Sequence, residues 1–260
     1  MDLHLRGKRV LITGASKGIG AAAAEAFAEE GCHLRLAARS GDQLKAVADR
    51  LRSAHQIDAA THVVDLRNGA DIARLVKDAD DIDILVNNAG DIPGGSIDKI
   101  DEPTWRHAWE LKVFGYINIT RAVYAQMKAR GGGVIINDIG VAGEKYDANY
   151  ICGSTGNAAL MSFTRALGSK SLADNIRVVG INPGPVGTDR HITLLKTRAK
   201  NQFGDENRYK EFQKGLPLGR PAHAREIGDL MAFLASDRSA YTSGVIFTVD
   251  GGIAAGSGWG

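Results

Sequence analysis

Three glycines, Gly14, Gly18 and Gly20, stand between an apolar run at residues 9–13 and an alanine-rich run at residues 19–30. The apolar run has the length of a buried strand, and the alanine-rich run predicts a helix. Glycine allows a tight turn and lets backbone N–H groups approach a ligand closely. A strand, a glycine turn and a helix in this order predict a parallel α/β unit that binds a pyrophosphate at the helix N-terminus. A glycine-rich turn without a ligand is the alternative.

The rest of the chain alternates short apolar runs with longer helical patterns. Further strands are predicted at residues 33–38, 61–64, 82–86, 133–138, 177–181 and 245–249. Helices are predicted at residues 41–54, 71–78, 105–130 and 149–173. Strands joined by helices run parallel, and their near-continuous apolar composition indicates a sheet that is covered on both faces. We therefore expect a doubly wound α/β fold.

Composition argues against several classes of protein. A formal net charge of +2, with acids and bases mixed along the chain, argues against a nucleic-acid or membrane-binding surface. No apolar run reaches about 18 residues and no signal-peptide core is present, so we expect neither a membrane span nor secretion. The two cysteines, Cys32 and Cys152, lie far apart and predict reduced thiols in a cytoplasmic protein. No cysteine–histidine spacing suits a metal, and we predict no metal site.

The tip of the second predicted strand indicates which dinucleotide binds. An NAD-selective site usually places Asp or Glu there to hold the ribose 2′-hydroxyl, but Ala37, Ala38 and Arg39 include no acid. Arg39 can pair with a 2′-phosphate, and Lys17 in the glycine turn can add a second positive charge. We therefore predict NADP as the cofactor, with NAD as the alternative if Arg39 is only a solvated loop residue.

These motifs resemble the short-chain dehydrogenase/reductase family along nearly the whole chain. Residues 13–20 match its glycine motif, and residues 87–90, Asn-Asn-Ala-Gly, match its fourth-strand motif. The loop at residues 182–188 is similar to its nicotinamide-side loop, and residues 219–252 carry its C-terminal pattern. The resemblance implies one Rossmann-like domain over residues 1–260 with about seven strands. It also implies a homotetramer or homodimer that interconverts a carbonyl and an alcohol on a small-molecule substrate.

The resemblance also assigns cofactor contacts. They lie in the glycine turn, at the ends of the second, third and fourth predicted strands, and in the 182–188 loop. The expected contacts are Gly14, Ser16, Lys17, Gly18, Ile19, Gly20, Arg39, Asp65, Leu66, Asn87, Ala89, Gly90, Pro183, Gly184, Val186 and Thr188. Within this set, Asp65 and Leu66 look like the family's adenine contact.

The catalytic positions depart from the family's pattern. Tyr150 stands at the tyrosine position, but Ser154, four residues later, stands where the family has lysine. Gly140 takes the position of the family's serine, and Lys112 takes that of its asparagine. Three of the four catalytic positions are therefore changed, and we treat Tyr150, Lys112 and Ser154 as the candidate catalytic set.

The chemistry of Tyr150 raises the question of its partner. A tyrosine with a pKa of about 10 is a serviceable acid at neutral pH and a poor base, unless a nearby ammonium stabilises the tyrosinate. Lys112 is long enough to place its ammonium near Tyr150, and we predict that it replaces the missing lysine. Alternatively, Lys112 faces solvent or pairs with an acid such as Glu110 or Asp147. Asp138, at the end of a predicted strand, is a further candidate base.

The sequence leaves three functions open. The first is an NADP-dependent oxidoreductase with an atypical active site, the second a catalytically silent NADP-binding sensor or scaffold, and the third a non-redox enzyme on the same fold. Residues 187–219 are charged and irregular, and they predict a substrate lid, an inserted helix pair or a solvated surface excursion. The glycine-rich tail at residues 251–260, with Trp259, is expected either to be disordered or to pack on a neighbouring subunit.

Overall fold

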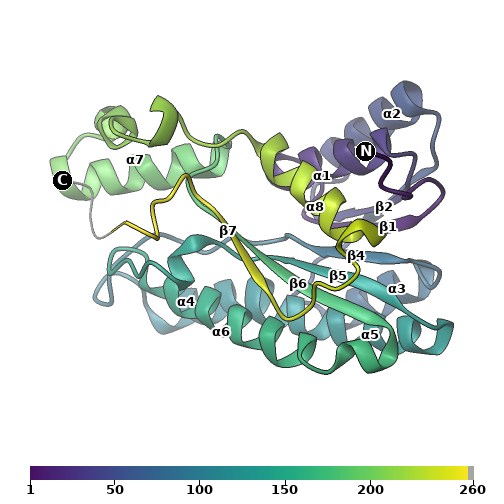
Figure 1. The fold of residues 1–260 in the computed structure, drawn as a ribbon. Helices are drawn as coiled ribbons and strands as arrows, with labels where there is room; N and C mark the ends of the chain where they lie inside the picture. The colour runs from purple at the N-terminus through teal and green to yellow at the C-terminus, as the bar shows by residue number, and fades with distance from the viewer. Residues whose placement is uncertain (257–260) are drawn as a thin grey trace.

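A single parallel sheet of seven strands organises the chain, in the order β3-β2-β1-β4-β5-β6-β7 (Figure 1). The computed structural model describes residues 1–256, so Trp259 lies outside the described residues. The strands are β1 (Arg9–Thr13), β2 (His33–Ala38), β3 (Ala59–Val63), β4 (Ile84–Asn87), β5 (Gly133–Asp138), β6 (Ile176–Pro183) and β7 (Ile246–Val249). Strand β1 pairs with both β2 and β4, so the chain reverses its direction across the sheet at this point. Ligands of such sheets bind at the carboxyl ends of the strands beside that reversal.

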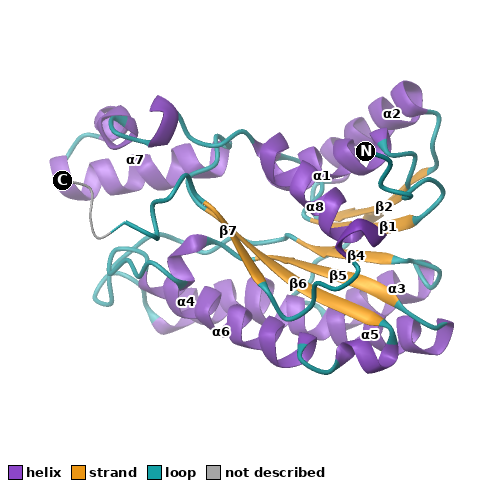
Figure 2. Cartoon of the chain, viewed as in Figure 1, coloured by secondary structure: helices purple, strands orange, loops and turns teal. Residues whose placement is uncertain are grey.

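Helices cover both faces of the sheet, which confirms the doubly wound prediction (Figure 2). One face carries α1 (Gly18–Glu29), α2 (Gly41–His55) and α8 (Ala224–Ala235). The other carries α3 (Gly69–Asp78), α5 (Gly115–Arg130) and α6 (Ile151–Gly168). Fully buried aliphatic side chains from alternate strand positions pack against both layers, as they do in parallel sheets.

The predicted helix at residues 105–130 is divided in the structure. It consists of α4 (Glu102–Trp109), a π-helical turn (Glu110–Phe114) and α5. A π turn inserts one extra residue into the helix and changes which side chains face inward. Lys112 lies in this turn, so helical periodicity alone does not place its side chain.

The predicted helix at residues 149–173 is shorter than expected. Tyr150 is the N-cap of α6, and the helix ends at Gly168 before a separate 3₁₀ turn (Ser171–Asp174). The segment predicted as a lid or helix pair contains α7 (Asp189–Phe203) and a 3₁₀ helix (Glu206–Gln213). Phe203 stacks on Phe212 across these two helices, with ring centroids 5.5 Å apart. Figure 1 shows α7 standing apart from the helices that cover the sheet.

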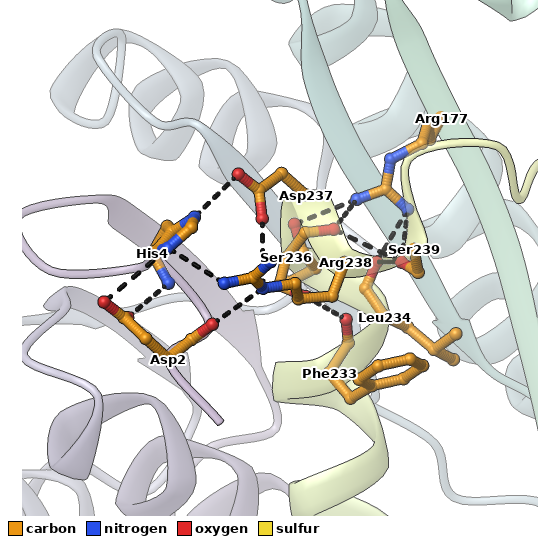
Figure 3. A network of polar contacts seen from close by, with 10 residues as sticks. Asp2, His4, Arg177, Phe233, Leu234, Ser236, Asp237, Arg238 and Ser239 are labelled. Atoms are coloured by element: carbon orange, nitrogen blue, oxygen red, sulfur yellow. Dashed lines mark hydrogen bonds and ion pairs between the residues drawn. The ribbon is translucent and has the colours of Figure 1, made fainter.

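Arg177 joins the last helix to the sheet (Figure 3). Its side chain leaves β6 and is only 8% exposed. Nη1 donates to the carbonyl of Leu234 (2.7 Å) and to the hydroxyl of Ser239 (3.0 Å). Nη2 donates to the carbonyls of Ala235 and Ser236, both at 2.9 Å. The guanidinium thus donates to carbonyls at the C-terminus of α8, where a positive charge also interacts favourably with the helix dipole.

The N-terminal segment reaches the same corner of the molecule. His4 Nδ1 lies 2.9 Å from a carboxylate oxygen of Asp237, and Arg238 donates to the carbonyl of Asp2 at 2.9 Å (Figure 3).

Cys32 and Cys152 are both free and buried. None of the helices in the described part of the chain is long and apolar enough to cross a membrane.

Candidate active site

A cavity of about 490 Å³ lies where the carboxyl ends of the strands meet the glycine turn. This volume is typical of small-molecule and cofactor sites. The predicted site residues that line it are Gly14, Ser16, Lys17, Gly18, Ile19, Arg39, Leu66, Ala89, Gly90, Lys112, Tyr150, Pro183, Gly184, Val186 and Thr188. The structure therefore brings together, in one cavity, residues from widely separated regions of the sequence.

The glycine turn fits a pyrophosphate. Gly14 has a φ of +68°, and a Cβ there would lie 2.8 Å from the side-chain nitrogen of Asn88. That nitrogen donates to the carbonyls of Thr13 (2.9 Å) and Gly14 (3.2 Å), which holds the turn in shape. Lys17, the N-cap of α1, makes no side-chain cap. The first N–H groups of the helix are thus left to an anion, which the helix dipole also favours.

Three predicted cofactor contacts do not line the cavity. A Cβ on Gly20 would lie 2.4 Å from the carbonyl oxygen of Gly14, so this glycine allows the turn to pack on the helix. Asp65 turns its carboxylate to Arg67, and its neighbour Leu66 lines the cavity instead. These residues shape or flank the site, and a direct cofactor contact by their side chains stays a prediction.

Asn87 is the third of these predicted contacts. It is fully buried and donates to the hydroxyl of Thr120 and the amide oxygen of Asn137, both at 2.9 Å. Both amide hydrogens are therefore used inside the protein. The neighbouring Asn88, which the family motif also contains, is the one that contacts the glycine turn.

Tyr150 lines the cavity. Its ring lies against Gly153, where a Cβ would come within 1.9 Å of a ring carbon. The glycine three residues after the tyrosine is the sequence signal that could have predicted this packing. Burial raises the pKa of Tyr150 above its ordinary value, and the nearby guanidinium of Arg190 partly opposes this. The phenol therefore stays protonated at neutral pH and can donate its proton.

Lys112 points into the protein rather than into solvent. The side chain of Lys112 packs against Gly90, where a Cβ would lie 2.9 Å from the lysine Cδ. Its ammonium donates to the carbonyl of Ile139 at 2.6 Å. Burial lowers the pKa of Lys112 to about 8, and the charge of Asp138 opposes the shift. Burial raises the pKa of Asp138 to about 6, and Lys112 opposes that shift in turn.

The guanidinium of Arg190 opposes the rise in the pKa of Tyr150, whereas the charge of Lys112 opposes the rise in the pKa of Asp138. Arg190 comes from the first turn of α7 and lines the same cavity. It donates to a carboxylate oxygen of Asp91 (2.8 Å) and to the carbonyl of Ile92 (2.6 Å). Sequence reasoning missed Arg190 because the charged segment around it offers many basic residues and no pattern that selects one.

Ser154, which stands at the lysine position, faces away from the cavity. Its hydroxyl accepts from the backbone N–H of Asp147 at 3.1 Å and so ties the loop before α6 to the helix. The serine position, Gly140, has a φ of +124°, and a Cβ there would lie 2.9 Å from the amide nitrogen of Asn157. A side chain at this position is therefore strained by the backbone conformation, and Asn157 would have to shift to accommodate it. Asn157, which no motif in the sequence singles out, lines the cavity at this point.

The Asp138→Asn variant is expected to be more stable than the parent at pH 7. The folded-state pKa of Asp138, about 6, lies above the ordinary value of 3.8, so the parent loses stability as pH rises between these two values. The gain in the free energy of unfolding should be roughly 2 kcal/mol at pH 7. This is less than the energy that corresponds to the whole pKa shift of Asp138, because Lys112 loses its counter-charge in the variant. The gain should vanish near pH 4. Urea unfolding at pH 4 and pH 7 measures it, with exposed Asp80→Asn as control. A gain that does not change with pH would contradict this prediction.

Comparison with known proteins finds one matching family, and similar proteins that include two enzymes and one solved structure. The family described as short chain dehydrogenase matches residues 8–199. The 2-keto-3-deoxy-L-fuconate dehydrogenase of Xanthomonas campestris pv. campestris is 34% identical over 96% of this chain and 81% of its own. The 3-oxoacyl-[acyl-carrier-protein] reductase of Chlamydia trachomatis serovar D is 31% identical over 95% of this chain and 97% of its own. The L-sorbose reductase of Gluconobacter frateurii, solved with NADPH and L-sorbose, is 33% identical with a TM-score of 0.88, covering 96% of this chain and 98% of its own.

Proposed function

Because the chain belongs to the short-chain dehydrogenase/reductase family and is a small-molecule oxidoreductase, we propose that it reduces a carbonyl compound with NADPH at an atypical active site. One observation carries the proposal. The phenol of Tyr150 lines the same cavity as the glycine turn and the uncapped N-terminus of α1. A proton donor and a dinucleotide cradle thus share one cavity, as hydride transfer requires.

Each part of the site has a role in this proposal. The turn around Gly14 and the amino end of α1 would hold the pyrophosphate, and a bound NADPH would supply the hydride. Tyr150 donates its proton to the carbonyl oxygen as negative charge develops there. The guanidinium of Arg190 stabilises the tyrosinate that remains, and the buried ammonium of Lys112 adds positive potential to the same cavity. Since the pKa of Tyr150 is raised, the site is better prepared for reduction than for oxidation at neutral pH.

Arg39 supports the choice of NADP. Its side chain is half exposed, lines the cavity beside Ala38 and Ser40, and lies 3.8 Å from a carboxylate oxygen of Asp91. A weak surface pair of this kind is easily exchanged for a 2′-phosphate. Relatives agree in part, since the L-sorbose reductase was solved with NADPH.

The Arg39→Ala variant is expected to weaken NADPH binding by about 10- to 100-fold, because a charged hydrogen bond to the 2′-phosphate is lost. NADH binding should change little, since NADH lacks that phosphate. Fluorescence titration of both reduced dinucleotides measures the two dissociation constants, with exposed Arg121→Ala as the matched control. An equal loss for NADPH and NADH would show that Arg39 does not read the phosphate.

The proposed activity is tested on the purified protein. Retained nucleotide is identified first, and the absorbance of NADPH is then followed with a panel of ketones and aldehydes. NADPH oxidation that depends on the carbonyl compound supports the proposal. The replacement of the serine and lysine positions by Gly140 and Ser154 favours one rival, a silent NADP-binding homologue, and binding without turnover would select that rival.

We also propose a cytoplasmic homo-oligomer, a dimer or a tetramer. Two buried, unpaired thiols, Cys32 and Cys152, support a reducing compartment. The oligomeric state follows from the family resemblance, and light scattering after gel filtration would measure it.

A further inference from the structure

Asn157 is a polar residue that lines the cavity and that the family's four catalytic positions do not include. It lies on α6, seven residues after Tyr150, and so on the same side of the helix. It is 3% exposed and lines the cavity. Its amide lies beside Gly140, where an added Cβ would be 2.9 Å from the amide nitrogen. Asn157 thus occupies the space next to the position from which a serine hydroxyl would otherwise project.

The orientation of the Asn157 amide is determined by its neighbour. Its nitrogen lies 3.2 Å from the carbonyl oxygen of Gly140 and donates to it. The reversed orientation would bring two acceptor oxygens together, so the amide oxygen is the atom left for a ligand. That oxygen is buried and has no hydrogen-bond partner among the described residues. A buried acceptor of this kind needs a donor, which a bound water can supply, or a ligand hydroxyl that replaces the water.

Asp138 offers a second acceptor in the same cavity. It is 6% exposed, and its Oδ1 is likewise buried without a partner in the described part of the chain. The cavity therefore combines a donor for a carbonyl oxygen, Tyr150, with two oxygens that can only accept while Asp138 is ionised. A ligand that matches this set has a carbonyl group and several hydroxyl groups.

We propose that the substrate is a polyhydroxylated carbonyl compound whose hydroxyl group next to the reacting carbonyl donates to the amide oxygen of Asn157. This inference rests on the proposed reductase function, with the carbonyl oxygen facing Tyr150. In the reduction, the carbonyl carbon gains a hydride from NADPH and the oxygen gains a proton from Tyr150, while the neighbouring hydroxyl is unchanged. An unsubstituted ketone or an acyl chain that displaces the water from the Asn157 oxygen offers no donor in its place, and it is therefore bound less well.

Matched carbonyl compounds test the proposal on the unmodified protein. The series acetone, hydroxyacetone and dihydroxyacetone adds one hydroxyl at a time, and L-sorbose is compared with 2-hexanone and ethyl acetoacetate. We expect kcat/KM to rise by about 10- to 100-fold when the first neighbouring hydroxyl is added. Equal or faster turnover of the ketones without hydroxyls would overturn the proposal.

The Asn157→Leu variant tests the residue itself. It keeps the approximate size of the side chain and removes both polar atoms, so the preference for hydroxyacetone over acetone should fall to about threefold or less. The thermal shift produced by NADP⁺ alone should stay unchanged, which shows that the variant folds and binds the cofactor. Asn118→Leu, an exposed position on α5, is the matched control and should keep the preference. An Asn157→Leu variant that folds and keeps the full preference would overturn the proposal.

A binding measurement separates this inference from the proposed function. If no carbonyl compound is reduced, the reductase proposal fails, but xylitol can still be compared with 1,5-pentanediol as a ligand of the NADP⁺-saturated protein. A thermal shift by xylitol that the diol lacks, and that Asn157→Leu abolishes, would support the polyhydroxylated ligand. Equal shifts by xylitol and the diol, or none, would overturn it.

Discussion

Replacing Tyr150 by phenylalanine is expected to lower kcat for NADPH-dependent carbonyl reduction by about 10²- to 10⁴-fold, the usual contribution of a positioned general acid. The phenol lines the cavity and its raised pKa keeps the proton in place at neutral pH. The substitution removes only the hydroxyl, so the ring still packs against Gly153 and the cavity keeps its shape. Steady-state kinetics on the best carbonyl compound found in the panel measures the effect.

Tyr146→Phe is the matched control, because Tyr146 precedes the same helix and is 81% exposed. It should leave kcat unchanged. Both variants should bind NADPH as the parent does, since Tyr150 does not touch the glycine turn in this proposal. In the direction of alcohol oxidation, the parent rate should increase as pH rises toward the raised pKa of Tyr150, because oxidation requires the tyrosinate. Unchanged kcat in Tyr150→Phe would exclude the tyrosine as the acid and direct attention to Lys112.

Replacing Arg177 by methionine is expected to lower the free energy of unfolding by about 3 kcal/mol or more. The buried guanidinium donates four hydrogen bonds, three of them to carbonyls at the end of α8. Methionine fills much of the volume but leaves these acceptors buried without a donor, and each such loss costs about 1–3 kcal/mol before relaxation. The melting temperature should fall by roughly 6–12 °C in a domain of this size.

Two controls separate the lost hydrogen bonds from the lost charge. Arg177→Lys keeps a positive charge at the helix end but cannot form the planar fork, so about half of the destabilisation should remain. Arg121→Met removes an exposed arginine on α5 and should change stability by no more than about 0.5 kcal/mol. Chemical unfolding and calorimetry measure these differences. A loss below about 1 kcal/mol in Arg177→Met would mean that α8 is held to the sheet by its apolar face alone.

The position of the Lys112 ammonium depends on the local helix geometry, which the sequence does not show. The sequence predicts that its ammonium takes over from the missing lysine beside Tyr150. In the structure Lys112 lines the cavity and its ammonium donates to the carbonyl of Ile139, while the guanidinium of Arg190 partly opposes the rise in the pKa of Tyr150. That Lys112 takes over from the missing lysine stays a prediction. The π turn (Glu110–Phe114) carries Lys112 inward, and no periodicity in the sequence predicts such a turn.

The sequence by itself determined the doubly wound sheet, the dinucleotide cradle at Gly14 and the candidate acid Tyr150. The sheet and the cradle depend on patterns that are local along the chain, namely apolar runs, helical spacing and glycine next to a helix start, whereas Tyr150 was assigned by the resemblance to the family. Only the tertiary structure decided that Arg190, Asp138 and Asn157 meet Tyr150 in one cavity, and that Ser154 turns away from it. The physical reason is that these groups come from elements far apart in sequence, so their distances depend on how helices pack and rotate on the sheet. Burial then affects the charge state of Asp138, and it leaves the Asn157 oxygen without a partner among the described residues. The type of a residue alone predicts neither property.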